Sequence, residues 1–194
     1  MTPVPRTHLD IPPGVLGSCI DGDRFRAIMS AFPSGVTVVT TVDEQDRPLG
    51  LTCSAACSVS QTPPLLLTCL HSASRVLTAI LAGRRLLVNF LRDNREATST
   101  RFATRQEDRF SSVAWRPAPG SGLPWLYRDT IAYADCALVG ALDAGDHTVL
   151  LGAIVDGQAP EETFGPLMYW RRQYGRWPVG EDAVTAALTM ATEG

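Results

Sequence analysis

The chain contains no lysine, and all 17 of its basic residues are arginines. Without a lysine amine, the protein cannot form an internal Schiff base, so that class of covalent catalysis is excluded. The 20 acidic residues give a formal net charge of −3. A chain without a positive excess is poorly suited to neutralising phosphates, so we expect no nucleic-acid partner.

The five cysteines form no Cys-X-X-Cys pair and no cysteine–histidine spacing typical of a metal site. Their odd number, inside apolar runs, is typical of reduced thiols that act as small core residues, and no metal is expected. The sequence also lacks an apolar leader segment and a run of about 20 apolar residues that could span a membrane. We therefore expect a cytoplasmic protein with no membrane partner.

The composition that is present describes one globular domain. The 194 residues, 45% of them hydrophobic, can bury a substantial core. Four prolines and the lack of periodicity in residues 1–20 predict a flexible N-terminal arm. We expect the folded domain over residues 21–177, followed at 178–194 by a C-terminal tail or short helix.

Hydrophobic periodicity predicts a mostly β domain with three modest helices. The first helix should be capped by Asp21 or Asp23 and stopped at Pro33. The other helices are expected near residues 73–81 and 94–103, and residues 105–129 should be irregular. Strands are expected at residues 35–42, from Gly50, and at 64–70, 86–91, 131–142, 148–157 and 167–170. Short links such as the polar turn 43–46 indicate antiparallel pairing, and this number of strands favours a small barrel.

The most informative stretch is GLTCSAACSVSQTPPLLLTCL, from Gly50 to Leu70. Small and hydroxylated side chains alternate from Thr52 to Ser58, where a strand would bury little apolar area. Such a strand allows a flat ligand to lie against the backbone while hydroxyls and amides reach its edge. The pattern therefore indicates a bound planar molecule.

Six motifs in this order make the chain similar to the short-chain flavin reductase family, from about Phe25 to Tyr174. They are FRAIMSAFPSGVTVVTT, GLTCSAACSVSQTPPLLL, LLVNFL, STRFA, the GDH at 145–147, and PLMYWRRQY. The resemblance implies an antiparallel Greek-key split β-barrel with a few flanking helices, which binds FMN or FAD at a homodimer interface. It also implies an NADH- or NADPH-dependent oxidoreductase that supplies reduced flavin to a separate monooxygenase.

The resemblance places Thr52, Cys53, Ser54 and Ala55 beside the isoalloxazine ring, with Ser34 at the mouth of the barrel. The alternative for this run is a Ser/Thr-rich strand with one face in solvent.

The segment from His71 to Arg75 combines two hydroxyls and a guanidinium between a strand and a helix. Ser72, Ser74 and Arg75 are therefore candidates for binding the flavin phosphate, although a helix cap uses the same geometry. Asn89 is a candidate flavin contact or a satisfied core amide. Ser99, Arg101 and Phe102 match the family's helix over the ribityl or adenine end, where the phenylalanine could equally be core.

The candidate catalytic residues are His147 and Arg172, which the resemblance places near the nicotinamide, with Tyr174 as a further contact. Hydride transfer between the cofactors needs no protein acid or base. What helps is a positive or hydrogen-bonding group near the flavin N1/O2 end. The alternative for His147 is a turn residue that faces water.

Two other functions stay open at this point. The protein could hold its flavin tightly and act on an organic substrate, with Trp115 and Trp125 lining the pocket. It could also be a flavin-binding protein without turnover.

Overall fold

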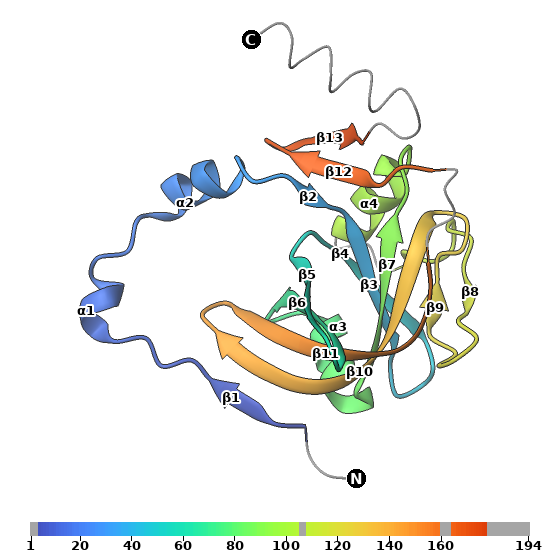
Figure 1. The fold of residues 1–194 in the computed structure, drawn as a ribbon, viewed down its shortest axis with the longest axis horizontal. Coiled ribbons are helices and arrows are strands. Elements are labelled where there is room, and N and C mark those ends of the chain that lie inside the picture. Colours follow the sequence, from blue (N-terminus) through green and yellow to red (C-terminus); the bar gives the residue numbers. More distant parts are fainter. Residues whose placement is uncertain (1–3, 105–107, 160–163, 178–194) are drawn as a thin grey trace, which may run out of the picture.

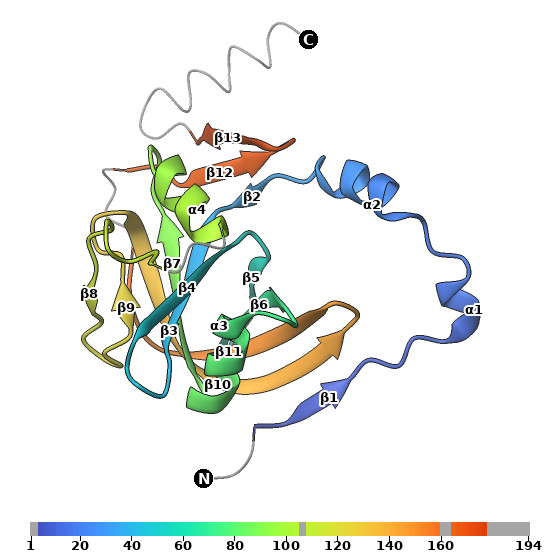
Figure 2. The same cartoon turned by 180° about the vertical axis from the view of Figure 1, so that it is seen from behind.

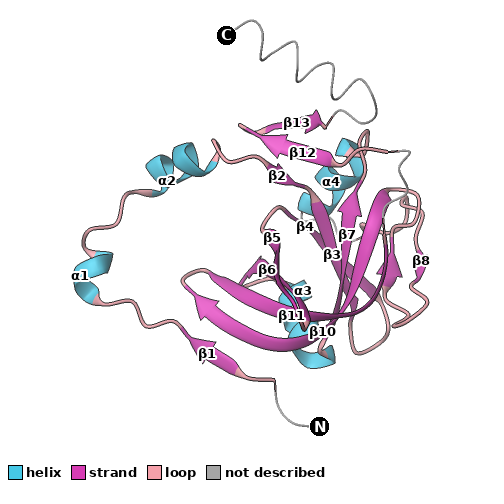
Figure 3. Ribbon diagram, viewed as in Figure 1, coloured by secondary structure: helices cyan, strands magenta, loops and turns pink. Residues whose placement is uncertain are grey.

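The computed structural model describes residues 4–104, 108–159 and 164–177 (Figures 1 and 3). The strands are β1 (Arg6–His8), β2 (Ser34–Gly35), β3 (Thr37–Val42), β4 (Pro48–Cys53), β5 (Ala56–Gln61), β6 (Pro64–His71), β7 (Arg85–Leu91), β8 (Arg116–Pro117), β9 (Pro124–Trp125), β10 (Thr130–Ala144), β11 (His147–Gln158), β12 (Leu167–Trp170) and β13 (Gln173–Arg176). The helices are α1 (Pro13–Leu16), α2 (Gly22–Met29), α3 (Arg75–Gly83) and α4 (Glu96–Ala103).

One sheet dominates the fold. Its strands follow the order β4-β3-β7-β10-β11-β6-β5, all antiparallel, and β1 joins by pairing in parallel with β10. The strands β13, β12 and β2 form a smaller sheet, and β8 pairs with β9. The predicted fold class, mostly β and antiparallel with few helices, is confirmed.

The two ends of the large sheet meet at Ser54 and Ala55, the two residues between β4 and β5. The backbone N–H of Cys69 donates to the carbonyl of Ala55 at 3.0 Å, so β6 also bonds to the bend. On the other side of the bend, the Cys53 thiol lies 3.3 Å from the Thr68 hydroxyl. These contacts bring the first and last strands together and close the sheet into a barrel.

This bend corrects the prediction of one continuous small-residue strand from Gly50. The run is two strands, β4 and β5, because the chain must turn to cross from one end of the sheet to the other. The segment 171–177 also contains a strand that the sequence did not predict, β13, and the irregular segment 105–129 contains the short pair β8 and β9. The weak helical pattern near the C-terminus lies outside the described residues.

The N-terminal segment runs outside the barrel before the chain joins it at β2 (Figures 1 and 2). Its start is attached to the barrel, because β1 pairs with β10 and the Arg6 guanidinium binds the Asp143 carboxylate at 2.9 Å. Asp21 caps α2 by accepting the N–H of Arg24 at 2.8 Å, which is one of the two predicted caps. Neither α1 nor α2 buries a residue. No helix in the described part of the chain is long and apolar enough to cross a membrane.

Helix α4 packs on β4 through a close contact at Gly50. A Cβ atom at this position would lie 2.9 Å from Cε1 of Phe102 and 3.1 Å from Cγ2 of Thr40. Phe102 is only 1% exposed and lies in a core cluster with Phe110 and Leu126. Glycine at position 50 therefore lets the aromatic ring reach the strand.

Replacing Gly50 with alanine should lower the free energy of unfolding by about 1–3 kcal/mol, because the added methyl group overpacks this contact. Denaturant unfolding measures the change. Gly83→Ala is the matched control, since no atom lies within 4 Å of its Cβ position. That control should leave stability unchanged or raise it by up to about 1 kcal/mol, as alanine favours a helix. Equal stability of the Gly50→Ala variant and the wild type would contradict the packing argument.

Candidate functional site

Two depressions lie along β4, and predicted residues line both. The first, the β4–α3 groove, encloses about 660 Å³ and is lined by Pro48, Leu49, Gly50, His71, Ala73, Ser74, Arg75, Val76, Arg109 and Phe110. The second, the β2–β12 hollow, encloses about 270 Å³ and is lined by Phe25, Arg26, Met29, Ser30, Phe32, Ser34, Ser54, Tyr169, Trp170, Arg171 and Arg172. Gly50 lies on β4 and Ser54 directly follows it, so about 13 Å of chain links the two depressions.

The β4–α3 groove has the chemistry of an anion site. Ser74 caps α3 by accepting the N–H of Val76 at 3.2 Å, and Arg75 is the first residue of the helix. The Arg109 guanidinium donates through Nη1 to the carbonyl of Gly50 at 2.6 Å. Its buried Nε has no hydrogen-bond partner among the described residues. No described residue that lines the groove is acidic. Two guanidinium groups, one with an unused buried donor, therefore fit a phosphate group such as that of a flavin.

Burial lowers the pKa of Arg109 from its ordinary value. An arginine nevertheless keeps its charge at any physiological pH. A bound anion would also supply the partner that its Nε lacks.

The β2–β12 hollow combines aromatic walls with hydroxyl groups. Ser34 on β2 pairs with Tyr169 on β12, and Ser54 approaches from the β4–β5 bend. Arg172 lies in the two-residue turn that joins β12 to β13, where Arg171 and Arg172 have φ values of 48° and 63°. Left-handed φ at both central positions matches the twist of a tight hairpin, so this turn directs Arg172 toward the hollow. The set suits a flat ring with polar edges.

Thr52, Ser99 and Tyr174 form one hydrogen-bonded cluster. The Thr52 hydroxyl donates to the Ser99 carbonyl at 2.6 Å, and the Tyr174 hydroxyl donates to Ser99 Oγ at 3.0 Å. The Tyr174 ring lies 5.2 Å from the Tyr169 ring, which lines the β2–β12 hollow. Because Ser99 is fully buried, this cluster connects α4, β4 and β13 rather than opening Ser99 to a ligand.

His147 begins β11 beside the β4–α3 groove. Its Nδ1 lies 2.7 Å from the Asp146 carboxylate, and its ring centroid is 5.4 Å from that of His71, which lines the groove. The hydrogen bond with His147 holds the pKa of Asp146 below its ordinary value. Ser72 also binds this turn, since its N–H donates to the Asp146 carbonyl at 2.9 Å. The ring nitrogen Nε2 of His147 has no hydrogen-bond partner among the described residues and can accept or donate to a ligand.

Three residues that were predicted to contact the flavin have their side chains in the core instead. Asn89 is fully buried, and its side-chain amide donates to Val38 and Thr40 while its oxygen accepts from Leu126. It is therefore the satisfied core amide that was the alternative. Phe102 is likewise core, and the Cys53 side chain is buried against Thr68, which leaves only the Cys53 backbone for a ligand.

The two predicted catalytic residues do not line one pocket in a single chain. Arg172 lines the β2–β12 hollow, whereas His147 lies against His71 at the β4–α3 groove. Two polar groove residues, His71 and Arg109, were not predicted as contacts. His71 belongs to the predicted His71–Arg75 motif, but Arg109 had no signal because it reaches the groove from an irregular segment.

An antiparallel barrel with an arginine-lined groove and a serine-edged hollow defines a protein suited to a phosphate-bearing planar cofactor. The sequence model of the flavin reductase like domain matches residues 29–178. The chain is 54% identical over 186 residues to the flavin reductase (NADH) of Kitasatospora aureofaciens, covering 96% of this chain and 95% of that one. It is 37% identical to the flavin reductase (NADPH) of Lentzea aerocolonigenes, covering 83% and 93% of the two chains.

A solved structure agrees in fold. The crystal structure of a homologue of nitrilotriacetate monooxygenase component B from Mycobacterium thermoresistibile superposes with a TM-score of 0.75. The two chains are 33% identical, and the match covers 84% of this chain and 88% of the other. The chain belongs to the flavin reductase family, and the predicted class of enzyme, a flavin-reducing oxidoreductase, is confirmed.

Proposed function

We propose that this flavin reductase uses NADH to reduce FMN or FAD that it binds as a dissociable substrate, and that the reduced flavin passes to a separate monooxygenase. The observation that carries the proposal is the pairing along β4 of an anion-binding groove with a hollow of aromatic and hydroxyl groups. A flavin nucleotide has both parts, a phosphate and a flat ring with polar edges. Hydride transfer itself is the chemistry of the two cofactors.

In this proposal the chain binds and orients the cofactors. Arg75, Arg109 and Ser74 hold the phosphate, while Ser34 and Ser54 lie at the ring edge. Arg172 and His147 supply positive or hydrogen-bonding groups where negative charge develops. Stacking of the two rings in a water-poor site then provides proximity.

The choice of NADH is supported by similarity. The relative at 54% identity is named for NADH, whereas the one named for NADPH is 37% identical. The monooxygenase partner is supported by the solved relative, which is a homologue of one component of a monooxygenase.

A nicotinamide assay tests this function. Purified protein should oxidise NADH at a rate that rises and saturates with added free FMN or FAD, and NADPH should be the poorer donor. A yellow protein whose rate of NADH oxidation does not change with added flavin would instead indicate a tightly bound prosthetic group. No oxidation of either nicotinamide with either flavin would contradict the proposal and leave a binding protein.

The proposed enzyme is a homodimer, and the outer face of the barrel supports this. The side chains of Leu67 on β6 and Leu151 on β11 are register partners that alternate with buried neighbours, so they point away from the core. Cys69 pairs with Val149 in the same way, and Val155 is 66% exposed. The four paired residues are only partly buried, and α1 and α2 have no buried residue. A second copy would bury both surfaces.

Leu151→Glu should weaken the dimer at least about tenfold, because it places a charge in an apolar interface. Sedimentation equilibrium measures the dissociation constant. Gln45→Glu, on the exposed turn between β3 and β4, adds the same charge and should leave assembly unchanged. A wild-type protein that sediments as a monomer at micromolar concentration would show that the face has another role.

A further inference from the structure

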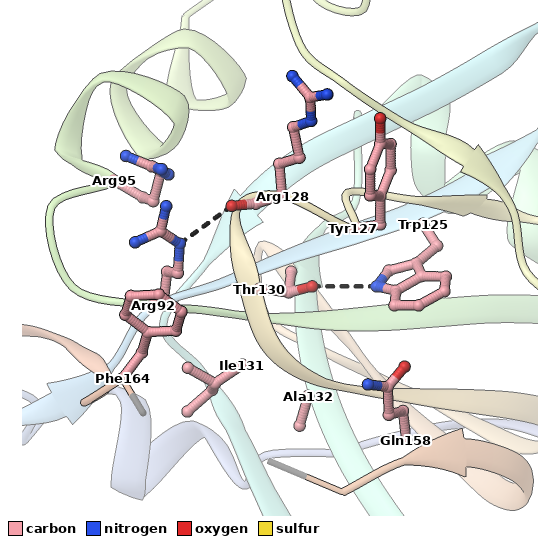
Figure 4. Close-up of a pocket in the computed structure, with 10 residues that line it drawn as sticks. All are labelled: Arg92, Arg95, Trp125, Tyr127, Arg128, Thr130, Ile131, Ala132, Gln158 and Phe164. Carbon is pink, nitrogen blue, oxygen red and sulfur yellow. Dashed lines mark hydrogen bonds between the residues drawn. The ribbon is translucent and has the colours of Figure 1, made fainter. Parts of the chain in front are cut away.

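We propose that a third depression, the arginine pocket, binds a small aromatic anion at a site separate from the flavin. The pocket encloses about 300 Å³ and shares no lining residue with the β4–α3 groove or the β2–β12 hollow. It is formed where β7 ends, β10 begins and β11 ends, as Figure 4 shows. Its lining is Arg92, Arg95, Trp125, Tyr127, Arg128, Thr130, Ile131, Ala132, Gln158 and Phe164.

The positive charge of this pocket exceeds what the described residues around it neutralise. Among the residues that the structure describes, three arginines line it and no acidic residue does. Arg95 is paired, since its Nε lies 2.7 Å from the carboxylate of Asp129. Arg92 donates its Nε to the Arg128 carbonyl at 3.0 Å. The terminal amino groups of Arg92 and the whole guanidinium of Arg128 have no hydrogen-bond partner within the described residues. They can therefore bind an anion without breaking an existing bond.

The rest of the wall suits an apolar, planar body. The Arg92 guanidinium stacks on the Phe164 ring at 4.3 Å from its centroid, and Ile131 and Ala132 lie beside it (Figure 4). Two polar groups of the remaining wall, the Trp125 indole and the Thr130 hydroxyl, already have partners. Trp125 Nε1 donates to the Thr130 hydroxyl at 3.0 Å, and that hydroxyl donates to the Leu126 carbonyl at 3.2 Å.

The arginines and the apolar part of the wall together define the class of ligand. Guanidinium groups bind carboxylates and phosphates through paired hydrogen bonds, and aromatic walls favour an aromatic ring. The volume admits a two-ring compound with one anionic group. An aromatic carboxylate and an aromatic phosphate ester share this chemistry, so the experiment uses both as probes.

Calorimetric titration of the full-length protein with 1-naphthoate and with 1-naphthyl phosphate tests the site. At least one should bind with a dissociation constant at or below about 1 mM, which is typical for a ligand of about 13 non-hydrogen atoms. The neutral 1-naphthamide should bind at least about tenfold more weakly, because it cannot form charge-assisted bonds. Inorganic phosphate should compete only at much higher concentration.

Two variants test whether the probe binds in this pocket. Arg128→Gln and Arg92→Gln should each weaken the better probe about tenfold, with NADH oxidation and melting temperature unchanged. Arg47→Gln is the matched control. The exposed Arg47 guanidinium pairs with Asp43 on the turn between β3 and β4 and does not line the arginine pocket. Absence of binding up to about 10 mM, equal binding of the amide, or unchanged affinity in both variants would overturn the proposal. Equal competition by inorganic phosphate would reveal an adventitious anion only, and displacement of the probe by NADH would show that the pocket is part of the nicotinamide site.

Discussion

Replacing Asn89 with alanine is expected to lower the free energy of unfolding by roughly 3 kcal/mol or more. The side chain has no exposed surface and links three parts of the fold. Its Nδ2 donates to the Val38 carbonyl at 3.1 Å and the Thr40 hydroxyl at 3.0 Å, and its oxygen accepts the N–H of Leu126 at 3.0 Å. Truncation leaves these buried groups without partners and opens a cavity between β7, β3 and the segment that follows β9.

Chemical denaturation measures the loss, and a flavin titration distinguishes the two roles considered for Asn89. At a temperature where the variant is folded, its flavin dissociation constant should stay within about threefold of the wild-type value, since the amide does not reach either depression. Gln45→Ala removes an exposed amide and should change stability by less than about 0.5 kcal/mol. Unchanged stability together with flavin binding weakened tenfold would restore Asn89 as a flavin contact.

The sequence predicted the elements whose signals are local. The Asp21 cap, the polar turn 43–46 and the β-branched strand before it involve neighbours in the chain, so propensity and periodicity identify them. The break at Ser54 and Ala55 has no such signal. It depends on Cys69 and Thr68, which approach it only after β6 has folded back. Likewise, the turn before β13 uses two arginines with positive φ, where a glycine or asparagine would have marked a hairpin.

In the candidate site, too, some residues could be predicted from the sequence and others could not. The resemblance placed Ser34 and Ser54 at the site, and the local His71–Arg75 motif placed Ser74 and Arg75 there; all four line depressions. Neither the resemblance nor the motif could decide whether a polar residue inside a strand faces a ligand or the core. Asn89 carries the same sequence signal in both cases, and only the carbonyls of distant segments show that its hydrogen bonds are satisfied. For the same reason, the arginine pocket combines residues 92, 128 and 164, which no local pattern connects.

Replacing His147 with alanine should lower kcat/KM for NADH by about a hundredfold, in the range seen when one preorganised donor is removed from a site of developing charge. Asp146 holds the imidazole through Nδ1 at 2.7 Å, and His71 contacts the ring edge-on. The hydrogen bond to the carboxylate orients the ring and directs Nε2 away from the turn. Asp146→Asn, which retains a hydrogen-bond acceptor but removes the charge, should therefore give a smaller loss of about tenfold.

The flavin dissociation constant of His147→Ala distinguishes a role of His147 toward NADH from a role in flavin binding. It should change less than about threefold in His147→Ala, because Arg75, Arg109 and Ser74 hold the phosphate in the proposed site. His8→Ala is the control, since His8 lies exposed on β1 and should leave both constants unchanged. If flavin affinity instead collapses in His147→Ala while the single-turnover rate of NADH oxidation at saturating flavin is preserved, His147 is a flavin-binding residue. An unaltered kcat/KM would show that the ring has no part in the reaction, as expected for a turn histidine held by Asp146 and His71.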